Sequence, residues 1–197
     1  MDTSTLEKHK EYTRNEYNNP YFSFVLETLK ENNIKTMIDA GACTGEVTKI
    51  MFENTTLEKA YIIEALQSNI GYIQENLQDH NIELHYNALI YGKDKVTFGR
   101  LPQNVGGGSV FLPGEVEVTA ITLEQLPIVD FLKLDIEGLE GNIIENSINI
   151  KKIKYLDIEF HHYDELLSQK ENRAEFLKKH LPHKIIKESY SNIFLSL

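Results

Sequence analysis

The stretch IDAGACTGEVT, residues 38–48, places an apolar run directly before a glycine-rich turn and a helical pattern. Residues 36–40 are expected to form a buried strand, and the spacing of Val47, Ile50 and Met51 predicts a helix over residues 44–52. Open parallel sheets bind nucleotide-like ligands where a strand feeds a helix in this way. The stretch therefore predicts both the fold class and the position of a ligand.

The same cycle of strand and helix repeats along the chain. Further strands are expected at residues 60–64, 82–89, 129–134 and 155–160, with helical apolar spacing between them and a last helix over residues 166–180. Strands that alternate with helices favour a parallel sheet covered on both faces. The final runs, residues 184–188 and 192–197, are expected to add an antiparallel hairpin. We therefore predict an α/β fold with a mostly parallel sheet.

The composition limits the domain number, the compartment and the partners. A length of 197 residues fits one domain, here residues 36–197 after a helical lead-in at residues 1–35. The formal net charge of −10 disfavours a nucleic-acid partner, because an acidic surface repels a polyanion. The single cysteine, Cys43, fits a reducing compartment, and no run resembles a secretory signal or a membrane span. A cytoplasmic protein without a membrane partner is expected.

Residues 18–21, Asn-Asn-Pro-Tyr, are similar to the N-P-P-Y motif of methyltransferases that act on the amino groups of nucleobases. That motif should follow a buried strand, whereas the preceding residues, EYTRNEY, are polar. Pro20 is instead expected to begin a helix that carries Phe22, Val25 and Leu29 on its apolar face.

The residues of the glycine turn discriminate between ligand classes. A phosphate-binding P-loop requires a lysine after its last glycine, but Glu46 follows Gly45. A dinucleotide fingerprint requires glycines where this chain has Cys43 and Glu46, and the carboxylate would repel a pyrophosphate. S-adenosylmethionine, which is cationic and has no phosphates, suits the turn better.

Three features of the turn and of the following strand fit that cofactor. Asp39 is expected to meet its ammonium group, and Gly41 and Gly45 would let the backbone approach it closely. Glu64, at the end of the second strand, could accept both ribose hydroxyls. The alternative is that the glycines only form a tight turn and that Glu64 is a solvated charge.

Several further motifs accompany the turn. They are IIEAL (62–66), the pair Asn87 and Ala88, ITLEQL (121–126), VDFLKLDIEGLEGNII (129–144) and the E-x-H of residues 159–161. With IDAGACTGEVT they resemble the FkbM-like family of S-adenosylmethionine-dependent methyltransferases, from about residue 34 to the C-terminus. The chain departs from the usual family pattern in having Ala65 where a proline is common, and its shortness argues against a large substrate-recognition cap.

The resemblance implies a Rossmann-like class I methyltransferase fold with a seven-stranded sheet. It also implies methyl transfer, usually to an oxygen, on sugars and other small hydroxylated metabolites. The cofactor-binding positions that the family motifs mark here are Asp39, Gly41, Ala42, Gly45, Glu64, Ala65, Asn87, Ala88 and Asp135.

Charges gather at the end of the strand at residues 129–134. By period two, Lys133, Asp135 and Glu137 would form a ladder on one side that approaches the ligand edge of the sheet. Asp135 would stand near the donor methyl, and Lys133 would neutralise its neighbours or steady a substrate oxygen. His161 is the first candidate for the base that removes a hydroxyl proton, with Asp135 as the second. The alternative is that His161 begins a surface loop.

Two other roles stay open for these regions. The side chains that could collect a divalent cation are Asp135, Glu137, Glu140, Glu159 and His161. Lys133 can satisfy the same carboxylates, so we predict no metal. The glycine-rich loop at residues 104–109 is either a flexible hairpin loop or a lid over a ligand.

The sequence thus predicts O-methylation of a hydroxyl on a small, sugar-like metabolite. Three alternatives remain: a nucleic-acid methyltransferase, a catalytically silent module that binds the cofactor, and an aminopropyl transferase in which the acidic residues bind a polyamine.

Overall fold

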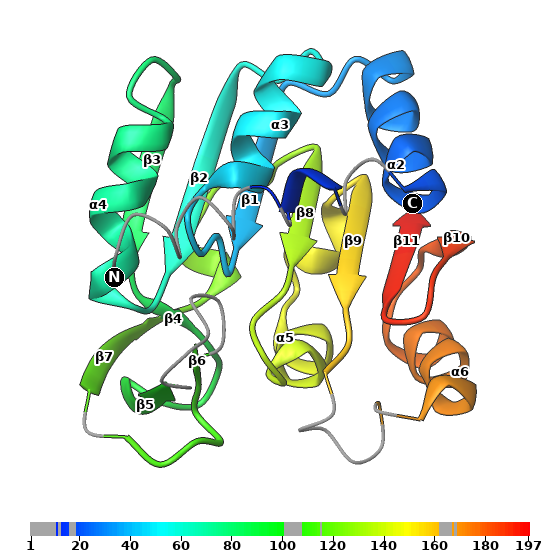
Figure 1. Cartoon of the computed structure of the whole chain (residues 1–197). Coiled ribbons are helices and arrows are strands. Elements are labelled where there is room, and N and C mark those ends of the chain that lie inside the picture. Colours follow the sequence, from blue (N-terminus) through cyan, green and yellow to red (C-terminus); the bar gives the residue numbers. More distant parts are fainter. Residues whose placement is uncertain are drawn as a thin grey trace.

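The computed structural model describes residues 11, 13–15, 19–100, 108–114, 116–161, 167 and 169–197. Its centre is a seven-stranded sheet in the order β10-β11-β9-β8-β1-β2-β3 (Figure 1). The strands are β1 (Thr36–Ala40), β2 (Lys59–Glu64), β3 (Ile82–Tyr86), β8 (Phe131–Leu134), β9 (Tyr155–Glu159), β10 (Lys184–Glu188) and β11 (Asn192–Ser196).

The strand pairings confirm the predicted sheet. The five strands from β3 to β9 are parallel to their neighbours, whereas β11 runs antiparallel to β9 and to β10. The change of direction at β11 produces the expected C-terminal hairpin. The carboxyl ends of β1, β2, β8 and β9 consequently meet at one edge, which Figure 1 shows at the bottom of the sheet.

Helices cover both faces of the sheet. The helices α2 (Pro20–Glu31), α3 (Glu46–Asn54) and α4 (Gln67–Asn76) pack on one face, and α5 (Glu140–Asn146) and α6 (Lys170–His180) on the other. The alternation of buried strand residues explains the two layers. Met37 contributes to the core beneath α2 and α3, while its neighbour Ile38 contributes to the core beneath α5 and α6.

The helix α2 begins as the sequence predicts. Pro20 occupies its first turn, and the side chain of Asn19 accepts hydrogen bonds from the backbone amides of Tyr21 and Phe22. Val25 and Leu29 are fully buried in the same core as Met37. The predicted lead-in thus shares the core of the domain, and Asn18 lies outside the described residues.

The predicted strand at residues 82–89 is in fact two strands. β3 ends at Tyr86, and β4 (Ala88–Leu89) belongs to a second, four-stranded sheet with β7 (Val116–Ile121), β5 (Lys95–Arg100) and β6 (Gly108–Ser109). Asn87 lies at the break, where its side-chain amide donates to the carbonyl of Thr119 in β7. The small sheet lies beyond the carboxyl ends of β2 and β3 (Figure 1). Of the predicted loop at residues 104–109, only Gly108 and Ser109 are described.

Phe194 of β11 provides a test of the core. Its fully buried ring contacts the rings of Phe24, Phe131 and Tyr155. We expect Phe194→Ala to lower the free energy of unfolding by about 3–5 kcal/mol, because it removes a large apolar side chain and leaves a cavity. Urea denaturation measures the change. In the same hairpin, Tyr190→Ala is the control, since that side chain is 91% exposed and its loss should cost less than about 0.5 kcal/mol.

Candidate active site

A cleft opens at the carboxyl edge of the main sheet. It encloses about 1080 Å³ of space, part of it open to solvent. Its wall comes from the turns after β1, β2 and β8 and from the small sheet. The predicted site residues in the wall are Gly41, Ala42, Glu64, Ala65, Asn87, Ala88, Lys133, Asp135 and Glu137.

The glycine turn is shaped by a close approach of two strands. Gly41 has a φ of +83°, and a Cβ built on it would lie 1.7 Å from the carbonyl oxygen of Asp135. Only glycine fits this position. Cys43 also has a positive φ, +54°, and its backbone amide donates to Glu64 at 2.8 Å. The turn is therefore held in one conformation by contacts with β2 and with the segment after β8.

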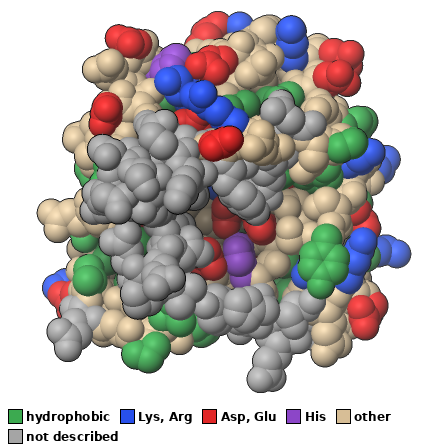
Figure 2. Space-filling view, viewed as in Figure 1, with side chains coloured by type: hydrophobic (Ala, Val, Ile, Leu, Met, Phe, Trp, Pro, Cys, Tyr) green, Lys and Arg blue, Asp and Glu red, His purple; other side chains and the backbone are tan. Residues whose placement is uncertain are grey.

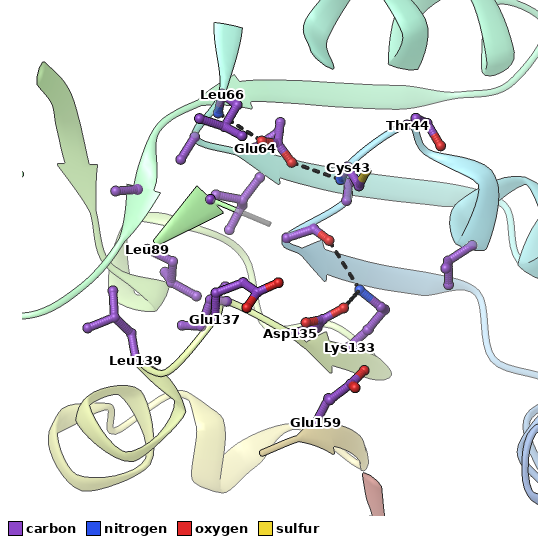
Figure 3. A pocket seen from close by; sticks show the side chains of 18 of the residues that line it. Cys43, Thr44, Glu64, Leu66, Leu89, Lys133, Asp135, Glu137, Leu139 and Glu159 are labelled. Carbon is purple, nitrogen blue, oxygen red and sulfur yellow. Dashed lines mark hydrogen bonds and ion pairs between the residues drawn. The ribbon is translucent and has the colours of Figure 1, made fainter. Parts of the chain in front are cut away.

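Glu64 connects the ends of β1 and β2 within the wall of the cleft. Its Oε2 accepts from the amide of Cys43 and its Oε1 from the amide of Leu66, both at 2.8 Å (Figure 3). Burial raises the pKa of Glu64 to about 7, although these hydrogen bonds oppose the shift. A carboxylate at this strand end fits the expected role toward ribose hydroxyls.

Lys133 is a buried cation in the middle of the site. The strand register pairs it with Asp39, whose Oδ1 lies 3.4 Å from its Nζ. Nζ also donates to Asp135 at 3.0 Å and to the carbonyl of Gly41 at 3.2 Å (Figure 3). Burial alone would lower the pKa of Lys133, but Asp135 and Asp39 hold it well above its usual value. The lysine stays charged and ties β1 to β8.

This arrangement changes the role expected for Asp39. Its side chain is fully buried, accepts a hydrogen bond of 2.6 Å from the hydroxyl of Thr48, and is not in the wall of the cleft. A direct contact with the ammonium group of a cofactor therefore does not follow from this placement. Asp39 instead holds Lys133 and the first turn of α3.

Gly45 is likewise outside the wall of the cleft. It precedes α3 with a φ of +77°, and a Cβ on it would lie 3.1 Å from the side chain of Leu77. Its absent side chain allows the helix to start close to α4. Packing against Leu77 therefore accounts for the glycine at position 45. Of the two glycines in the turn, Gly41 is the one that lines the cleft.

The charged ladder predicted after β8 does not continue by period two. The strand ends at Leu134, and Glu137 has a left-handed φ of +55°. Glu140 holds this turn, because its carboxylate accepts from the amides of Ile136 and Gly138 at 3.0–3.2 Å. Glu137 nevertheless reaches the cleft from the turn rather than from the strand.

His161 lies beside these carboxylates. Its Nδ1 is 3.0 Å from Glu140, and its Nε2 is 3.5 Å from Asp135 and 3.6 Å from Glu137. Burial opposes protonation, but the hydrogen bond to Glu140 and the nearby negative charges raise the pKa of His161 to about 9. An imidazolium has no lone pair to accept a proton. We therefore revise the expectation that His161 is the first candidate base.

Glu137 is better placed for that task. Burial, together with Asp135 and Glu140, raises its pKa to about 7, although His161 opposes the shift. A carboxylate with a pKa near neutrality is suited to remove a proton from a bound hydroxyl. Asp135 is engaged by Lys133, so it is less available as a base.

The described part of the chain contains no group of three or more His, Cys, Asp or Glu side chains arranged to hold a metal ion. The carboxylates of the alternative cation site instead surround Lys133 and His161. Acidic side chains and a histidine are visible together in a recess of the surface in Figure 2. No helix found within the described ranges is both long and apolar enough to cross a membrane.

The sequence did not reveal the contribution of the small sheet. Phe98 and Gly108 line the cleft, and a Cβ on Gly108 would meet Leu66 at 2.7 Å. Ser109 is buried, and its hydroxyl donates to the carbonyl of Glu137 at 2.8 Å. The glycine run at residues 106–108 was the available signal, but it does not indicate which distant turn it contacts.

Comparison with protein-family models gives a match over most of the chain. A family model described as the methyltransferase FkbM domain matches residues 39–183. The chain belongs to the FkbM methyltransferase family. The match covers the glycine turn, the turn after β8 and the E-x-H segment, so the family resemblance seen in the motifs is confirmed. No curated protein matches the chain.

Solved structures share the fold of this FkbM domain. Methyltransferase FkbM from Methylobacillus flagellatus KT superposes with a TM-score of 0.54 at 16% identity, over 84% of this chain and 44% of that one. Sp1610 of Streptococcus pneumoniae, provisionally assigned as a tRNA (m1A22) methyltransferase, gives 0.53 at 11% identity, over 90% and 69%.

Precorrin-6y C5,15-methyltransferase from Geobacter metallireducens GS-15 gives a TM-score of 0.51 at 14% identity, over 91% of this chain and 90% of that chain. These superpositions show the shared Rossmann-like methyltransferase fold. The chain spans less than half of the Methylobacillus protein.

Glu64 provides a pH-dependent test of the cofactor site. Its ionised form accepts hydrogen bonds better, and its raised pKa means that it becomes protonated as the pH falls through about 7. We expect the affinity for S-adenosylhomocysteine to decrease between pH 8 and pH 6, and Glu64→Ala to weaken binding roughly tenfold or more at pH 8. Isothermal titration calorimetry measures both. Equal affinity of Glu64→Ala and wild type would remove this residue from the cofactor site.

Proposed function

We propose that this FkbM domain transfers a methyl group from S-adenosylmethionine to a hydroxyl of a small, uncharged, sugar-like metabolite. The observation that carries the proposal is the position of Glu137. Its carboxylate, with a pKa of about 7, shares one cleft with the glycine turn and Glu64. A base for the acceptor and a site for the donor therefore lie in the same wall.

The side chains and backbone groups in the wall of the cleft suit the cofactor. Gly41 and Ala42 expose backbone at one side, Glu64 presents a carboxylate, and Leu66 and Leu89 supply apolar surface for a flat ring. When bound, S-adenosylmethionine supplies an electrophilic methyl group on a positively charged sulfur. The remaining steps depend on side chains of this chain.

Glu137 accepts the hydroxyl proton of the acceptor as its oxygen forms a bond to the methyl carbon. The bond from that carbon to sulfur breaks, sulfur retains the electron pair, and S-adenosylhomocysteine and a protonated Glu137 result. Positioning supplies most of the acceleration in such a displacement. The turn that carries Glu137 is held by Glu140 and by Ser109, which fixes the base relative to the glycine turn.

His161 and Lys133 have supporting roles in this proposal. Lys133 contacts both the carboxylate of Asp135 and the carbonyl of Gly41, so it holds Asp135 beside the glycine turn. The imidazolium of His161 lies between Asp135, Glu137 and Glu140, where it reduces the repulsion among three carboxylates. Both cations act by placing and balancing the acidic groups rather than by accepting a proton.

The electrostatics favour a small acceptor over a nucleic acid. Asp135, Glu137 and Glu159 face the cleft, and the whole chain carries a net charge of −10. Phosphate groups would be repelled from such a site. The tRNA assignment of the Streptococcus protein concerns a structure that is 11% identical, so it indicates the shared fold and leaves the acceptor of this chain to experiment.

An acceptor panel tests this proposal. The protein and labelled S-adenosylmethionine are incubated with neutral sugars and polyols, with tRNA and with putrescine, and transfer of label is measured for each. We expect label on at least one hydroxylated small molecule and none on tRNA. Labelled RNA would support the nucleic-acid alternative. A parallel incubation replaces the donor by decarboxylated S-adenosylmethionine, and its turnover with putrescine would support aminopropyl transfer. Binding without any turnover would indicate a silent module.

Glu137→Gln tests the proposed base. We expect kcat to fall roughly 100-fold or more, since general-base catalysis contributes about this much. Affinity for S-adenosylhomocysteine should change less than about threefold, because Glu64 is intact. In the wild type, the logarithm of kcat should rise with pH up to about 7 and then level off, as Glu137 loses its proton. If His161→Ala, and not Glu137→Gln, removes this pH dependence, the base is His161.

A further inference from the structure

Two polar side chains lie next to each other where β9 meets β11 at the carboxyl edge of the main sheet. The antiparallel register pairs Glu159, the last residue of β9, with Asn192, the first residue of β11. Both residues line the cleft. Neither belongs to the turns after β1 and β2, and Asn192 lies beyond the residues that the family model matches. This part of the wall is therefore separate from the part that suits the cofactor.

Asn192 is a buried side chain with unused hydrogen-bonding capacity. It is 6% exposed, and its Oδ1 accepts from the hydroxyl of Ser191 at 2.8 Å, which fixes the amide group. The side-chain nitrogen of Asn192, by contrast, donates to no described residue. An asparagine amide can donate two hydrogen bonds, and buried polar groups are nearly always satisfied. Such a donor in the wall of a cleft points to a ligand that accepts hydrogen bonds.

Glu159 supplies the complementary group. Figure 3 shows its side chain below Lys133, and it interacts electrostatically with that cation. Because a carboxylate accepts hydrogen bonds and an amide nitrogen donates them, Glu159 and Asn192 together can bind hydroxyls in both senses. Phe22 of α2 adds apolar surface to the same wall. An acceptor, a donor and an aromatic ring suit a sugar-like ring, which has hydroxyls at its edge and C–H groups on its faces.

The position of this pair relative to the proposed base indicates how large the ligand must be. In the sheet, β9 is the neighbour of β8, and β11 follows β9. Neighbouring strands are about 5 Å apart, so β11 lies about 10 Å from β8, the strand that leads to Glu137. A single hydroxyl bound at Glu137 is therefore remote from Asn192. A ring with several hydroxyls can place one of them at Glu137 and others at Glu159 and Asn192.

We propose that Glu159 and Asn192 form a specificity subsite for the methyl acceptor. Asn192 donates to, and Glu159 accepts from, hydroxyls of a polyhydroxylated ring other than the hydroxyl that is methylated. This inference rests on the proposed function, and it narrows the acceptor to a neutral ring with more than one hydroxyl. The subsite binds the ring equally before and during methyl transfer, so its loss raises KM and leaves kcat nearly unchanged.

Kinetics with rings that differ in their hydroxyls test the subsite. The probes are methyl α-glucopyranoside, methyl α-galactopyranoside, methyl α-mannopyranoside and myo-inositol, with cyclohexanol as the ring that has a single hydroxyl. We expect methyl transfer to at least one of the polyhydroxylated rings, with a kcat/KM roughly tenfold or more above that of cyclohexanol. For that ring, Asn192→Ala and Glu159→Gln should each raise KM roughly tenfold, the usual effect of one lost hydrogen bond, while kcat changes less than about threefold.

Monodeoxy analogues of the methylated ring show whether Asn192 contacts a hydroxyl directly. With the analogue that lacks the contacted hydroxyl, Asn192→Ala should change KM less than about twofold, because the contact is already missing. An equal increase of KM with the parent ring and with every analogue would overturn the subsite. An unchanged KM of both Asn192→Ala and Glu159→Gln for the parent ring would also overturn it.

Asn81→Ala and Glu188→Gln are the matched controls, because both residues are exposed and lie outside the wall of the cleft. Neither should alter KM, and the affinity for S-adenosylhomocysteine should stay within about twofold in all four variants. Methyl transfer to none of the hydroxylated small molecules would overturn the proposed function. Transfer to other members of the acceptor panel but to none of the four polyhydroxylated rings would overturn this inference alone. If Glu159→Gln fails to fold, Asn192→Ala carries the test.

Discussion

The charged contact that the site depends on is the burial of the Lys133 ammonium between β1 and β8. A buried cation is tolerated only with close partners, and here Asp39, Asp135 and the carbonyl of Gly41 all lie within 3.4 Å of its Nζ. These partners fix three separate segments relative to one another: the end of β1, the glycine turn and the start of the turn after β8. The close approach of Gly41 to the backbone of Asp135 follows from the same packing. The lysine therefore sets the distance between the glycine turn and the turn after β8, which carry the proposed cofactor and acceptor sides of the cleft.

The turn after β8, which carries the proposed base, extends outward from that point. The turn after β8 contains Glu137 in a left-handed conformation, which a non-glycine residue adopts only when its surroundings hold it there. Glu140 supplies one restraint through the amides of Ile136 and Gly138, and Ser109 of the small sheet supplies another through the carbonyl of Glu137. Because Gly108 packs on Leu66, the same short strand contacts the cofactor side as well. The small sheet thus joins the two halves of the site.

Sequence patterns were sufficient for the main sheet and insufficient for the roles of its polar residues. Apolar runs and glycines located β1, β2, β8 and β9, because burial on both faces requires such runs. The segment at residues 82–89 read as one strand, since periodicity does not indicate that a chain changes sheets at Asn87. The sequence indicated that Asp39 and His161 lie near the carboxyl edge of the main sheet. It did not indicate their partners, because these come from other strands and turns. The register of β1 against β8 shows that Asp39 pairs with Lys133. The turn after β8 places three carboxylates around His161, and these keep its imidazole charged.

The acidic composition has a specific consequence at this edge of the sheet. Lys133 and His161 remain protonated at neutral pH because carboxylates surround them, whereas burial brings the pKa values of Glu64 and Glu137 to about 7. In the proposed function Glu64 lies on the cofactor side and Glu137 on the acceptor side, so both halves of the site would change charge over the same pH range. A substrate that is itself negative would oppose ionisation of both groups, and a neutral one would not. The excess of carboxylates in the sequence therefore favours a neutral acceptor, because a neutral acceptor leaves the two buried glutamates free to ionise.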